Sequence, residues 1–491
     1  ARRGGFKYLV KTVFLLLILQ AAVLALLTPL AILIQLKGPG WDMLLLNPEA
    51  FIFAGFLFSF LIKAPGPGKI KSVPGLRSSI IFGLIAALCS MFLILRPQPG
   101  STKGAILIYD KGYMNWRVPV YGFYGYKSGG MFGYLPRFLR ASGFDVETVN
   151  RLDRENLSGA DAVVVINVLE YFSDGEKEAV REFVHRGGGL LVLGDHTGVQ
   201  GIRGPFNDLL APYGIEFLFD SATFFTKGWG EEAVLMPHPV THGLHSPYEM
   251  DIWVGASLAI RPPARPVVVA KYGYSDFGDI TAIDHAYLGN RVFDPGEQLG
   301  DLVLVAANEY GKGRVLVFGD TSPFQNNAMV ASHRFVSRVA SWLVSGGSGG
   351  PARNIIFPIV IAITAIVVLV RKNALLAGVI SIAVLLGSIA GLVPRRIDRV
   401  VELDMSTAVI DLSHFQRFDR LTWYDHCTGG LQYNLMRAGC FPLSCEEFSE
   451  RQILRSGIVV IVAPVRSFSE SEIEILERFM EKGGWILYTC G

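Results

Sequence analysis

The feature that most constrains this chain is an internal repeat with a fixed spacing. The segment Phe172–Leu193 (FSDGEKEAVREFVHRGGGLLVL) lies over Phe468–Thr489 (FSESEIEILERFMEKGGWILYT) without a gap, at a spacing of 468 − 172 = 296 residues. Gly143 and Gly439 keep the same spacing. Because a helix start, a helix, a glycine stop and a strand coincide in both segments, we expect one folding unit to be present twice.

The second copy covers residues 397–491 and contains only the first part of the unit. Gly491 lies over Asp195, which is well inside the first copy. A sheet that ended there would lack half of its strands. We therefore expect either that the polypeptide continues beyond Gly491 or that the missing strands come from elsewhere.

Within the first copy, short apolar runs alternate with segments of helical spacing. Ala105–Tyr109, Ala162–Ile166 and Leu190–Leu193 have the length and composition of buried strands. Ser173, followed three residues later by Glu176, is a capping box that begins a helix. Further strand-like runs and a closing helix lie at Val267–Ala270, Leu302–Ala306, Arg314–Phe318 and about 327–344. This alternation predicts a mostly parallel, flavodoxin-like sheet with helices on both faces.

Two strongly apolar blocks flank the first copy, and 51% of all residues are hydrophobic. The longest apolar stretches are at 8–36, 50–62, 79–95, 355–370 and 374–393. A membrane-spanning helix needs about 20 such residues. The predicted fold class is therefore membrane helices plus a duplicated α/β fold. Its parts are three membrane helices in 1–100, the first α/β domain in 101–348, a membrane hairpin in 352–394 and the second domain in 397–491.

The distribution of charge predicts an orientation and excludes one class of partner. Lys and Arg cluster at 2–11, 63–77 and 371–372, all on one side of the predicted spans, although Arg395, Arg396 and Arg399 lie on the other. The positive-inside rule then places the N-terminus in the cytoplasm and both α/β domains outside it, in a multi-pass cell-membrane protein. The chain has 45 basic and 43 acidic residues and no basic stripe, so we do not expect it to be a dedicated nucleic-acid-binding protein.

Several His and Asp residues fall where α/β proteins place their sites, at the carboxyl ends of strands. Asp110 follows the first predicted strand, Asp195-His196 the third and Asp320 the last; His238 and His242 lie in a loop with His245. Two interpretations stay open. These groups bind a divalent metal or a polar ligand, with Asp195, His196, His238 and His242 as metal candidates. Alternatively, the aspartates cap the following turns and the histidines are loop residues.

Four segments taken in order resemble a known superfamily. They are HRGGGLLVLGDH at 185–196, PFNDLLAPYGIEF at 205–217, HPVTHGL at 238–244 and GKGRVLVFGDTSPFQNN at 311–327. The chain resembles the class I glutamine-amidotransferase-like superfamily, and within it the membrane-anchored branch that includes auxiliary proteins of gliding-motility ABC transporters. The resemblance implies an amidotransferase-like α/β fold in 103–345 and, in part, in 397–491.

The sequence departs from that superfamily at its nucleophile. Amidotransferases carry a Gly-x-Cys-x-Gly elbow after this strand, whereas this chain has Gly194-Asp195-His196-Thr197-Gly198. In the second copy Cys490 falls over Gly194, not over His196. Glutamine hydrolysis through a thiolate is therefore not expected, and no P-loop, HExxH or GxSxG motif suggests another reaction.

Two functions follow as hypotheses. The first is a non-catalytic, membrane-anchored scaffold or accessory subunit, a pseudoenzyme whose domains bind a partner protein, glycan or peptide beside the bilayer and other membrane subunits. The second is a membrane-bound hydrolase with a metal or His–Asp site at Asp195, His196 and Asp320. The aromatic stretch Tyr113–Tyr126 either packs on its own domain or stacks on a ligand. Cys440 and Cys445 either form a disulfide or remain free thiols.

Overall fold

The computed structural model describes residues 103–345 and 403–489, with internal gaps. The gaps are at 112–114, 199–201, 203, 219, 227, 237, 242–243, 245–246, 279–286, 288 and 415–427. The two described stretches belong to one compact unit, which comprises 99–347 and 398–491.

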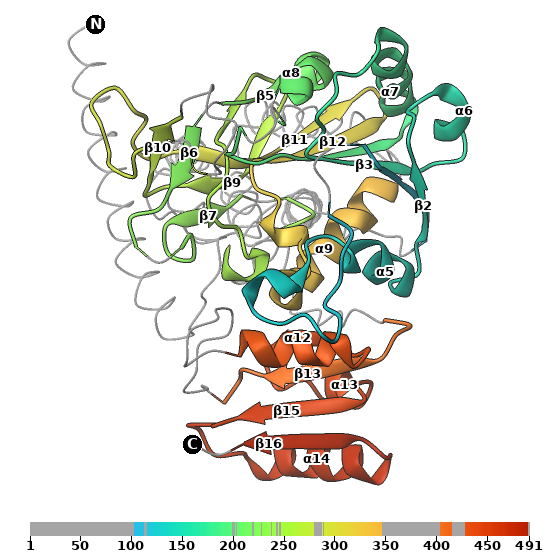
Figure 1. Cartoon of the computed structure of the whole chain (residues 1–491), viewed down its shortest axis with the longest axis vertical. Coiled ribbons are helices and arrows are strands. Elements are labelled where there is room, and N and C mark those ends of the chain that lie inside the picture. Colours follow the sequence, from blue (N-terminus) through green and yellow to red (C-terminus); the bar gives the residue numbers. More distant parts are fainter. Residues whose placement is uncertain are drawn as a thin grey trace, which may run out of the picture. The chain divides into compact units, whose positions relative to one another are not determined.

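The centre of the first domain is an eight-stranded sheet with the strand order β2-β1-β3-β4-β12-β11-β9-β7 (Figure 1). Its strands are β1 (Ala105–Tyr109), β2 (Asp145–Val149), β3 (Ala162–Ile166), β4 (Gly189–Leu193), β7 (Ala233–Leu235), β9 (Arg265–Ala270), β11 (Leu302–Tyr310) and β12 (Gly313–Phe318). The strands from β2 to β12 are parallel to one another. The pairs β12–β11, β11–β9 and β9–β7 are antiparallel.

The expectation of a mostly parallel sheet is therefore wrong, because the sheet is mixed. The cause is the short connection between two of the predicted strands. β11 and β12 form a hairpin, and the turn Gly311-Lys312 between them has Gly311 at φ 61°, a conformation that glycine adopts without strain. A connection of two residues permits only antiparallel pairing, since a parallel crossover needs a dozen residues or more.

Helices cover both faces of this sheet, as the alternation of elements predicts. α5 (Tyr134–Ala141) and α9 (Met329–Val344) pack on the face that carries Ile106 and Ile108. α6 (Arg154–Leu157), α7 (Asp174–Arg186) and α8 (Gly204–Leu210) pack on the opposite face, which carries Leu107 (Figure 1). Because successive strand residues point to opposite faces, one short apolar strand supplies both cores.

Short elements complete the first domain and lie mostly around its antiparallel half. They are η1 (Tyr126–Gly129), η3 (Ala211–Tyr213), β5 (Ile215–Phe217), β6 (Asp220–Thr223), η4 (Pro247–Met250), β8 (Leu258–Ile260), β10 (Tyr274–Phe277) and η5 (Ser322–Phe324). β5 pairs with β8 and β6 with β10, each pair outside the main sheet.

The second domain repeats the start of this plan. Its elements are β13 (Thr407–Asp411), α12 (Gly429–Arg437), β14 (Phe441–Cys445), α13 (Glu450–Ile453), β15 (Ile458–Val462), α14 (Glu470–Glu481) and β16 (Trp485–Thr489). Its four strands are parallel in the order β14-β13-β15-β16. β2, β3 and β4 each match a strand of this sheet at a spacing of 296 residues (441 − 145, 458 − 162 and 485 − 189). The 296-residue spacing seen in the sequence therefore also holds for these three strands.

The two copies share a surface. The rings of Tyr134 and Phe138 contact the ring of Phe441 at centroid distances of 5.3 and 5.7 Å. The Tyr134 hydroxyl donates a hydrogen bond to the backbone carbonyl of Met436 at 2.8 Å. Phe441 and Met436 belong to the same apolar cluster as α5 and α9, so part of the first domain's core continues into the second copy.

Among the described residues, no helix is both long and apolar enough to cross a membrane. The five predicted spans, in residues 1–100 and 352–394, lie outside the described residues. The predicted fold class, the transmembrane assignment and the multi-pass, extracytoplasmic location are corrected on this ground. The fold that the structure supports is an α/β fold with a mixed eight-stranded sheet and a partial second copy.

Candidate functional site

The candidate site lies at the carboxyl ends of β4 and β12, which are neighbours in the sheet. Phe318 pairs with Leu193, and the next N–H, that of Gly194, donates to the Phe318 carbonyl at 3.0 Å. The segments that follow the two strands are therefore side by side. The Thr321 hydroxyl donates to the Asp195 carboxylate at 3.2 Å. Two segments separated by more than a hundred residues in sequence thus meet at one edge of the sheet.

Asp320 is the most buried acid of this site, at 4% exposure. Its carboxylate accepts the backbone N–H of Trp253 at 2.6 Å and both the N–H and the hydroxyl of Ser322, at 2.8 and 2.7 Å. Burial, and then the nearby charge of Asp195, raise the pKa of Asp320 to about 7. The hydrogen bonds only partly offset these two effects.

One glycine permits the close packing around Asp320. A Cβ at Gly255 would lie 2.7 Å from both the Asp320 Cβ and the Gly319 carbonyl oxygen. Ala256, the next residue, donates its N–H to that same carbonyl at 2.8 Å. The loop before β8 therefore lies directly against the end of β12 and restricts access to Asp320 from that side.

His196 has three polar or aromatic neighbours from different parts of the chain. Its Nδ1 lies 3.0 Å from the Ser221 hydroxyl, and its Nε2 lies 3.5 Å from the Asp195 carboxylate. Its ring contacts the Tyr287 ring edge-on at a centroid distance of 5.7 Å. Ser221 has an exposure of 0%. A Ser–His–Asp grouping is therefore present, but its hydroxyl is closed off from solvent.

Tyr287 is fixed in turn by hydrogen bonds to β10 and β6. Its hydroxyl donates to Asp276 at 2.7 Å and lies 2.7 Å from the hydroxyl of Thr223. Asp276 also accepts the backbone N–H groups of Asn290 and Arg291, at 2.9 and 2.6 Å. Burial is the main reason why the pKa of Tyr287 is raised. The tyrosine therefore stays a neutral hydrogen-bond donor beside His196.

The other predicted site residues do not lie at the carboxyl ends of β4 and β12. Asp110 follows β1 and is exposed, and it accepts the indole N–H of Trp116 at 2.7 Å. His238 packs on the ring of Trp342, at the end of α9, with a centroid distance of 4.7 Å. The backbone carbonyl of Trp342 accepts a hydrogen bond from Arg314, which lies at the start of β12. Asp320 follows the other end of the same strand. His238 therefore lies at the opposite edge of the sheet from Asp320. His242 and His245 lie outside the described residues.

The described residues contain no group of three or more His, Cys, Asp or Glu side chains that could hold a metal ion. The candidate metal set of Asp195, His196, His238 and His242 is divided by the fold, because His238 lies at the far edge. The Asp195–His196 pair remains as a polar site with Thr321 and Ser221 as neighbours.

Sequence reasoning missed three polar residues at this edge of the sheet: Ser221, Thr321 and Asn167. Ser221 lies in a short strand without a motif. Asn167 follows β3 directly and has an exposure of 2%. It has a left-handed backbone with φ 42°, and its Oδ1 has no hydrogen-bond partner among the described residues. An asparagine directly after a buried strand is a signal that could have been used, since Asn tolerates this conformation better than most residues.

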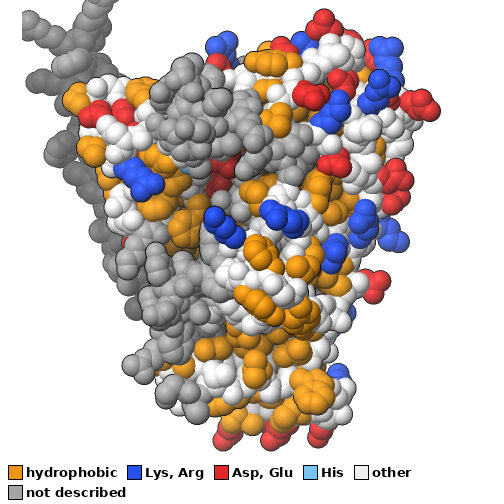
Figure 2. Space-filling model, in the orientation of Figure 1, with side chains coloured by type: hydrophobic (Ala, Val, Ile, Leu, Met, Phe, Trp, Pro, Cys, Tyr) orange, Lys and Arg blue, Asp and Glu red, His pale blue; other side chains and the backbone are white. Residues whose placement is uncertain are grey.

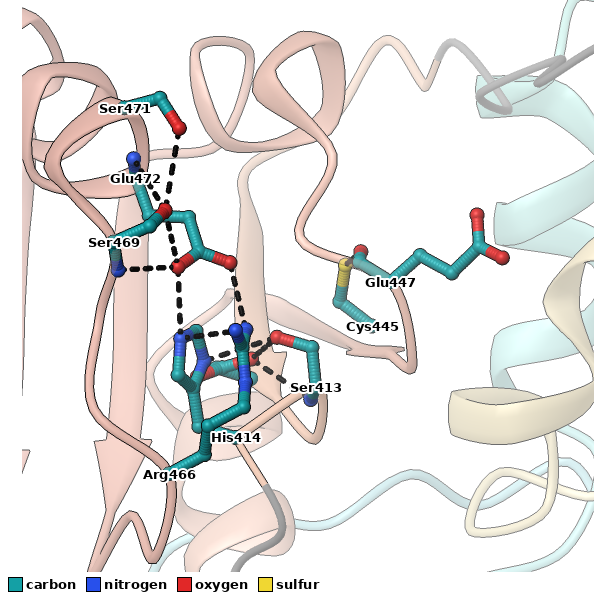
Figure 3. A network of polar contacts seen from close by, with 9 residues as sticks. Ser413, His414, Cys445, Glu447, Arg466, Ser469, Ser471 and Glu472 are labelled. Atoms are coloured by element: carbon teal, nitrogen blue, oxygen red, sulfur yellow. Dashed lines mark hydrogen bonds and ion pairs between the residues drawn. The ribbon is translucent and has the colours of Figure 1, made fainter.

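In the second copy the corresponding edge is filled by a polar cluster, which we call the His414 cluster (Figure 3). His414 Nδ1 lies 2.6 Å from Asp411 Oδ2, and Nε2 lies 3.0 Å from the Arg466 guanidinium and 3.5 Å from Glu472 Oε2. The imidazole stacks on Phe468 at 3.7 Å and has an exposure of 0%. Burial opposes ionisation of Glu472, but hydrogen bonds from Ser469 and Arg466 hold its pKa at about 2.

Both cysteines of the second copy that the structure describes are free thiols. Cys440 immediately precedes β14 and Cys445 ends it. Five residues of extended chain span roughly 17 Å, far beyond the reach of a disulfide. The interpretation as free thiols is therefore confirmed, and that of a Cys440–Cys445 bridge is wrong.

Comparisons with known proteins give one family and several distant structures. A family model described as a domain of unknown function (DUF4350) matches residues 133–336, within the first domain. None of the curated proteins compared with the chain matches it.

Solved structures that resemble the chain are distant. The N-terminal domain of mmIFT52 is 17% identical with a TM-score of 0.34, covering 50% of this chain and 100% of its own. A cytoplasmic protein from Salmonella typhimurium LT2 is 17% identical with a TM-score of 0.29, covering 50% and 97%. A putative ThuA-like protein from Parabacteroides merdae is 16% identical with a TM-score of 0.29, covering 49% and 89%. Structural similarity at these TM-scores and sequence identities does not support a conclusion about function.

Proposed function

We propose that this protein is a non-catalytic scaffold or accessory protein, whose amidotransferase-like first domain binds a partner protein, glycan or peptide. The observation that supports the proposal is the burial of Ser221. It is the hydroxyl beside His196, and it is fully buried. A nucleophile must reach its substrate, so this grouping is a packed polar contact and not a working triad. His196 itself stands where amidotransferases carry cysteine.

Hydrogen bonding of the two aspartates supports the same conclusion. Asp195 accepts the backbone N–H of His196 at 2.8 Å, and Asp320 accepts those of Trp253 and Ser322. Carboxylates that accept backbone N–H groups hold loops in place. The site therefore fixes the geometry of the sheet edge, and binding there depends on shape and hydrogen bonds.

An exposed aromatic loop offers a surface for a partner. Val120, Tyr121, Phe123 and Tyr124 are all about half exposed or more, with Tyr121 at 68%. Figure 2 shows apolar side chains at the surface where Figure 1 places the loop before α5. Arg437 of the second copy donates to the carbonyls of Val120 and Phe123 and lies over the Tyr124 ring. The loop is therefore held in one conformation while its aromatic faces remain available.

A second candidate function is a hydrolase that uses His196 with Asp195. The 3.0 Å contact between His196 and Ser221 favours it. In that case a conformational change would have to expose Ser221. The two functions make opposite predictions for a reagent that labels activated serines.

The test treats the full chain with a fluorophosphonate probe and measures bound metal by mass spectrometry. Wild type is compared with Ser221→Ala and His196→Ala. We expect no labelling and no stoichiometric metal in any of the three. Labelling of the wild type that is lost in Ser221→Ala would contradict the scaffold proposal, as would one equivalent of metal that is lost in His196→Ala.

Binding is tested separately, by affinity purification from the native source. A tagged variant with Tyr121→Ser and Phe123→Ser is compared with wild type and with Tyr272→Ser, another exposed aromatic. We expect a bound partner to be lost only from the loop variant. Equal recovery from all three proteins would remove the loop from the proposed binding surface.

A further inference from the structure

The strand β16 of the second copy lies at an edge of its sheet and exposes apolar side chains. β15 pairs with it on one side, and no described strand lies on the other. Trp485, Leu487 and Tyr488 are 76, 42 and 56% exposed. In the first copy the counterparts of Leu487 and Tyr488, at the same spacing of 296 residues, are Leu191 and Val192, which are only 3 and 0% exposed. The same positions are therefore core in one copy and surface in the other.

The first copy shows which element covers these positions. There β12 pairs with β4 in parallel, from Arg314 opposite Gly189 to Phe318 opposite Leu193. The strand β12 is apolar along most of its length and begins with one basic residue. The uncovered edge of β16 is thus the edge that an apolar, parallel strand occupies in the first copy.

The backbone of β16 has hydrogen-bonding groups directed to this edge. Successive residues of a strand direct their N–H and C=O groups to alternate sides. Trp485 donates its N–H to the carbonyl of Gly457, next to β15, at 3.1 Å, and the carbonyl of Thr489 accepts the N–H of Ala463, which follows β15, at 2.8 Å. The odd-numbered residues therefore face β15.

The N–H and C=O groups of Ile486 and Tyr488, which lie between them, face the free edge.

One difference in sequence shows that the second copy is not covered in the same way as the first. In the first copy α9 packs against Gly189, where a Cβ would lie only 2.6 Å from the carbonyl oxygen of Leu343. Trp485 stands at this place in the second copy (485 − 189 = 296). An indole leaves no room for a helix packed as α9 is. An added strand without such a helix fits β16.

The other edge strands of the two main sheets are blocked against strand addition. β2 carries Asp145 and Glu147, β14 contains Pro442, and β7 has only three residues. Proteins use charges, prolines and short lengths to keep exposed edges from pairing. β16 (WILYT) has five residues, with neither a charge nor a proline. An open, aromatic edge of this kind suits the binding of an extended segment.

Charge beside the edge adds to the chemistry of the partner. The helix α14, which packs beside β16, carries Glu474, Glu477 and Glu481, all of them exposed. Figure 2 shows acidic side chains at the lower end of the view, where Figure 1 places α14. The one arginine of this helix, Arg478, already pairs with Glu450 at 2.6 Å. A basic residue in an added strand would therefore be attracted to these carboxylates.

We propose that the free edge of β16 binds an extended, apolar segment of a partner protein as a parallel strand, in the place that β12 takes beside β4. The N–H and C=O groups of Ile486 and Tyr488 bind its backbone. Trp485 and Tyr488 contact its apolar side chains, and a basic residue in it lies near the glutamates of α14. This inference rests on the proposed function, since it names the form of the partner that the non-catalytic protein binds.

The experiment measures fluorescence anisotropy of a labelled peptide with the sequence of residues 311–320 (GKGRVLVFGD), which contains β12. Wild-type full chain is compared with Tyr488→Pro and Tyr488→Val. Proline removes one N–H at the free edge, where an edge strand tolerates it, and valine keeps this N–H. We expect saturable binding by wild type, a loss of affinity of about tenfold or more in Tyr488→Pro, and an affinity within about threefold of wild type in Tyr488→Val. Thermal unfolding shows whether each variant is folded.

Hydrogen exchange of the wild type tests the same contact without a variant. Bound peptide should slow the exchange of the Ile486 and Tyr488 amides, because their N–H groups then donate to the added strand. The amide of Tyr121, in the aromatic loop, should exchange at the same rate with and without peptide.

Three results in these measurements would overturn the inference: no binding of the peptide, equal binding by wild type and a folded Tyr488→Pro, or unchanged exchange at Ile486 and Tyr488. A dimer in sedimentation that Tyr488→Pro abolishes would also overturn it, because a second copy would then occupy the edge. Fluorophosphonate labelling that depends on Ser221 would instead contradict the non-catalytic function and leave the β16 site standing.

Discussion

The backbone N–H of Trp253 donates to the carboxylate of Asp320 across 2.6 Å, joining the loop before β8 to the end of β12. Asp320 is buried there beside Asp195, and burial is the larger of the two effects that raise its pKa to about 7. The unfolded chain has the ordinary value of 3.8. The folded protein therefore holds this proton more tightly than the unfolded chain does.

The pH dependence of stability should show this difference. The contribution of Asp320 is fully present below pH 3.8 and is lost as the pH rises through 7, a loss on the order of 4 kcal/mol. Asp320→Asn should flatten the stability profile between pH 4 and pH 7, measured by urea unfolding at a series of pH values. An unchanged slope in the variant would show that Asp320 is already ionised in the fold at low pH.

His333 should produce the opposite trend at lower pH. It is buried in α9 and faces the carbonyl of Val330 at 3.0 Å, and burial followed by the charge of Arg334 lowers its pKa from 6.5 to about 3. Its contribution is present above pH 6.5 and is lost as the pH falls toward 3, on the order of 4 kcal/mol in all. His333→Leu should remove this acid sensitivity in the same unfolding series. If the variant lost stability at low pH as the wild type does, His333 would not be the cause of the acid sensitivity.

The duplicated capping boxes allow a matched comparison. Ser173 and Ser469 each accept the N–H of the glutamate three residues later, at 3.3 Å. Each Ser→Ala change should cost about 1 kcal/mol. Glu472→Gln should cost more than Glu176→Gln, because Glu472 also accepts Arg466 at 2.7 Å and lies beside His414. Equal costs in chemical denaturation would show that the His414 cluster adds no stability.

Arg437 should control the order of the aromatic loop. It donates to the carbonyl oxygens of Val120 and Phe123 and to the hydroxyl of Ser128, at 3.0, 2.9 and 2.6 Å. Arg437→Ala should lower stability by about 1–3 kcal/mol and expose residues 118–128 to limited proteolysis. Lys482→Ala, after α14, serves as the surface control. Proteolysis at the same rate in wild type and Arg437→Ala would show that other contacts fix the loop.

Local patterns were sufficient for the repeating elements of the fold. Ser173 and Glu176 predicted a capping box that the structure contains, and the 296-residue spacing predicted the matching box at Ser469. The buried strands Ala162–Ile166 and Ile458–Val462 were also visible as apolar runs. Such features depend on residues a few positions apart, so their physical cause is contained in the sequence itself.

The candidate site could be predicted only in part. The sequence placed Asp195, His196 and Asp320 at strand ends, and the structure brings them to one edge because β4 and β12 are adjacent. It could not show that His238 lies at the opposite edge, since that depends on the antiparallel direction of β7. No sequence motif marks Ser221 or Asn167 as a site residue. They are recognised only by their burial in the folded structure.

The sequence by itself determined that the chain contains one α/β unit and the start of a second, because strand length, helix capping and glycine stops are local properties. Tertiary structure alone decided the mixed character of the sheet, the neighbours of His196 and the burial of Ser221. It also decided that the imidazole of His414 is buried among Asp411, Arg466 and Glu472 in the second copy. These outcomes arise from packing between distant segments, and hydrogen bonding across such contacts depends on which elements become neighbours.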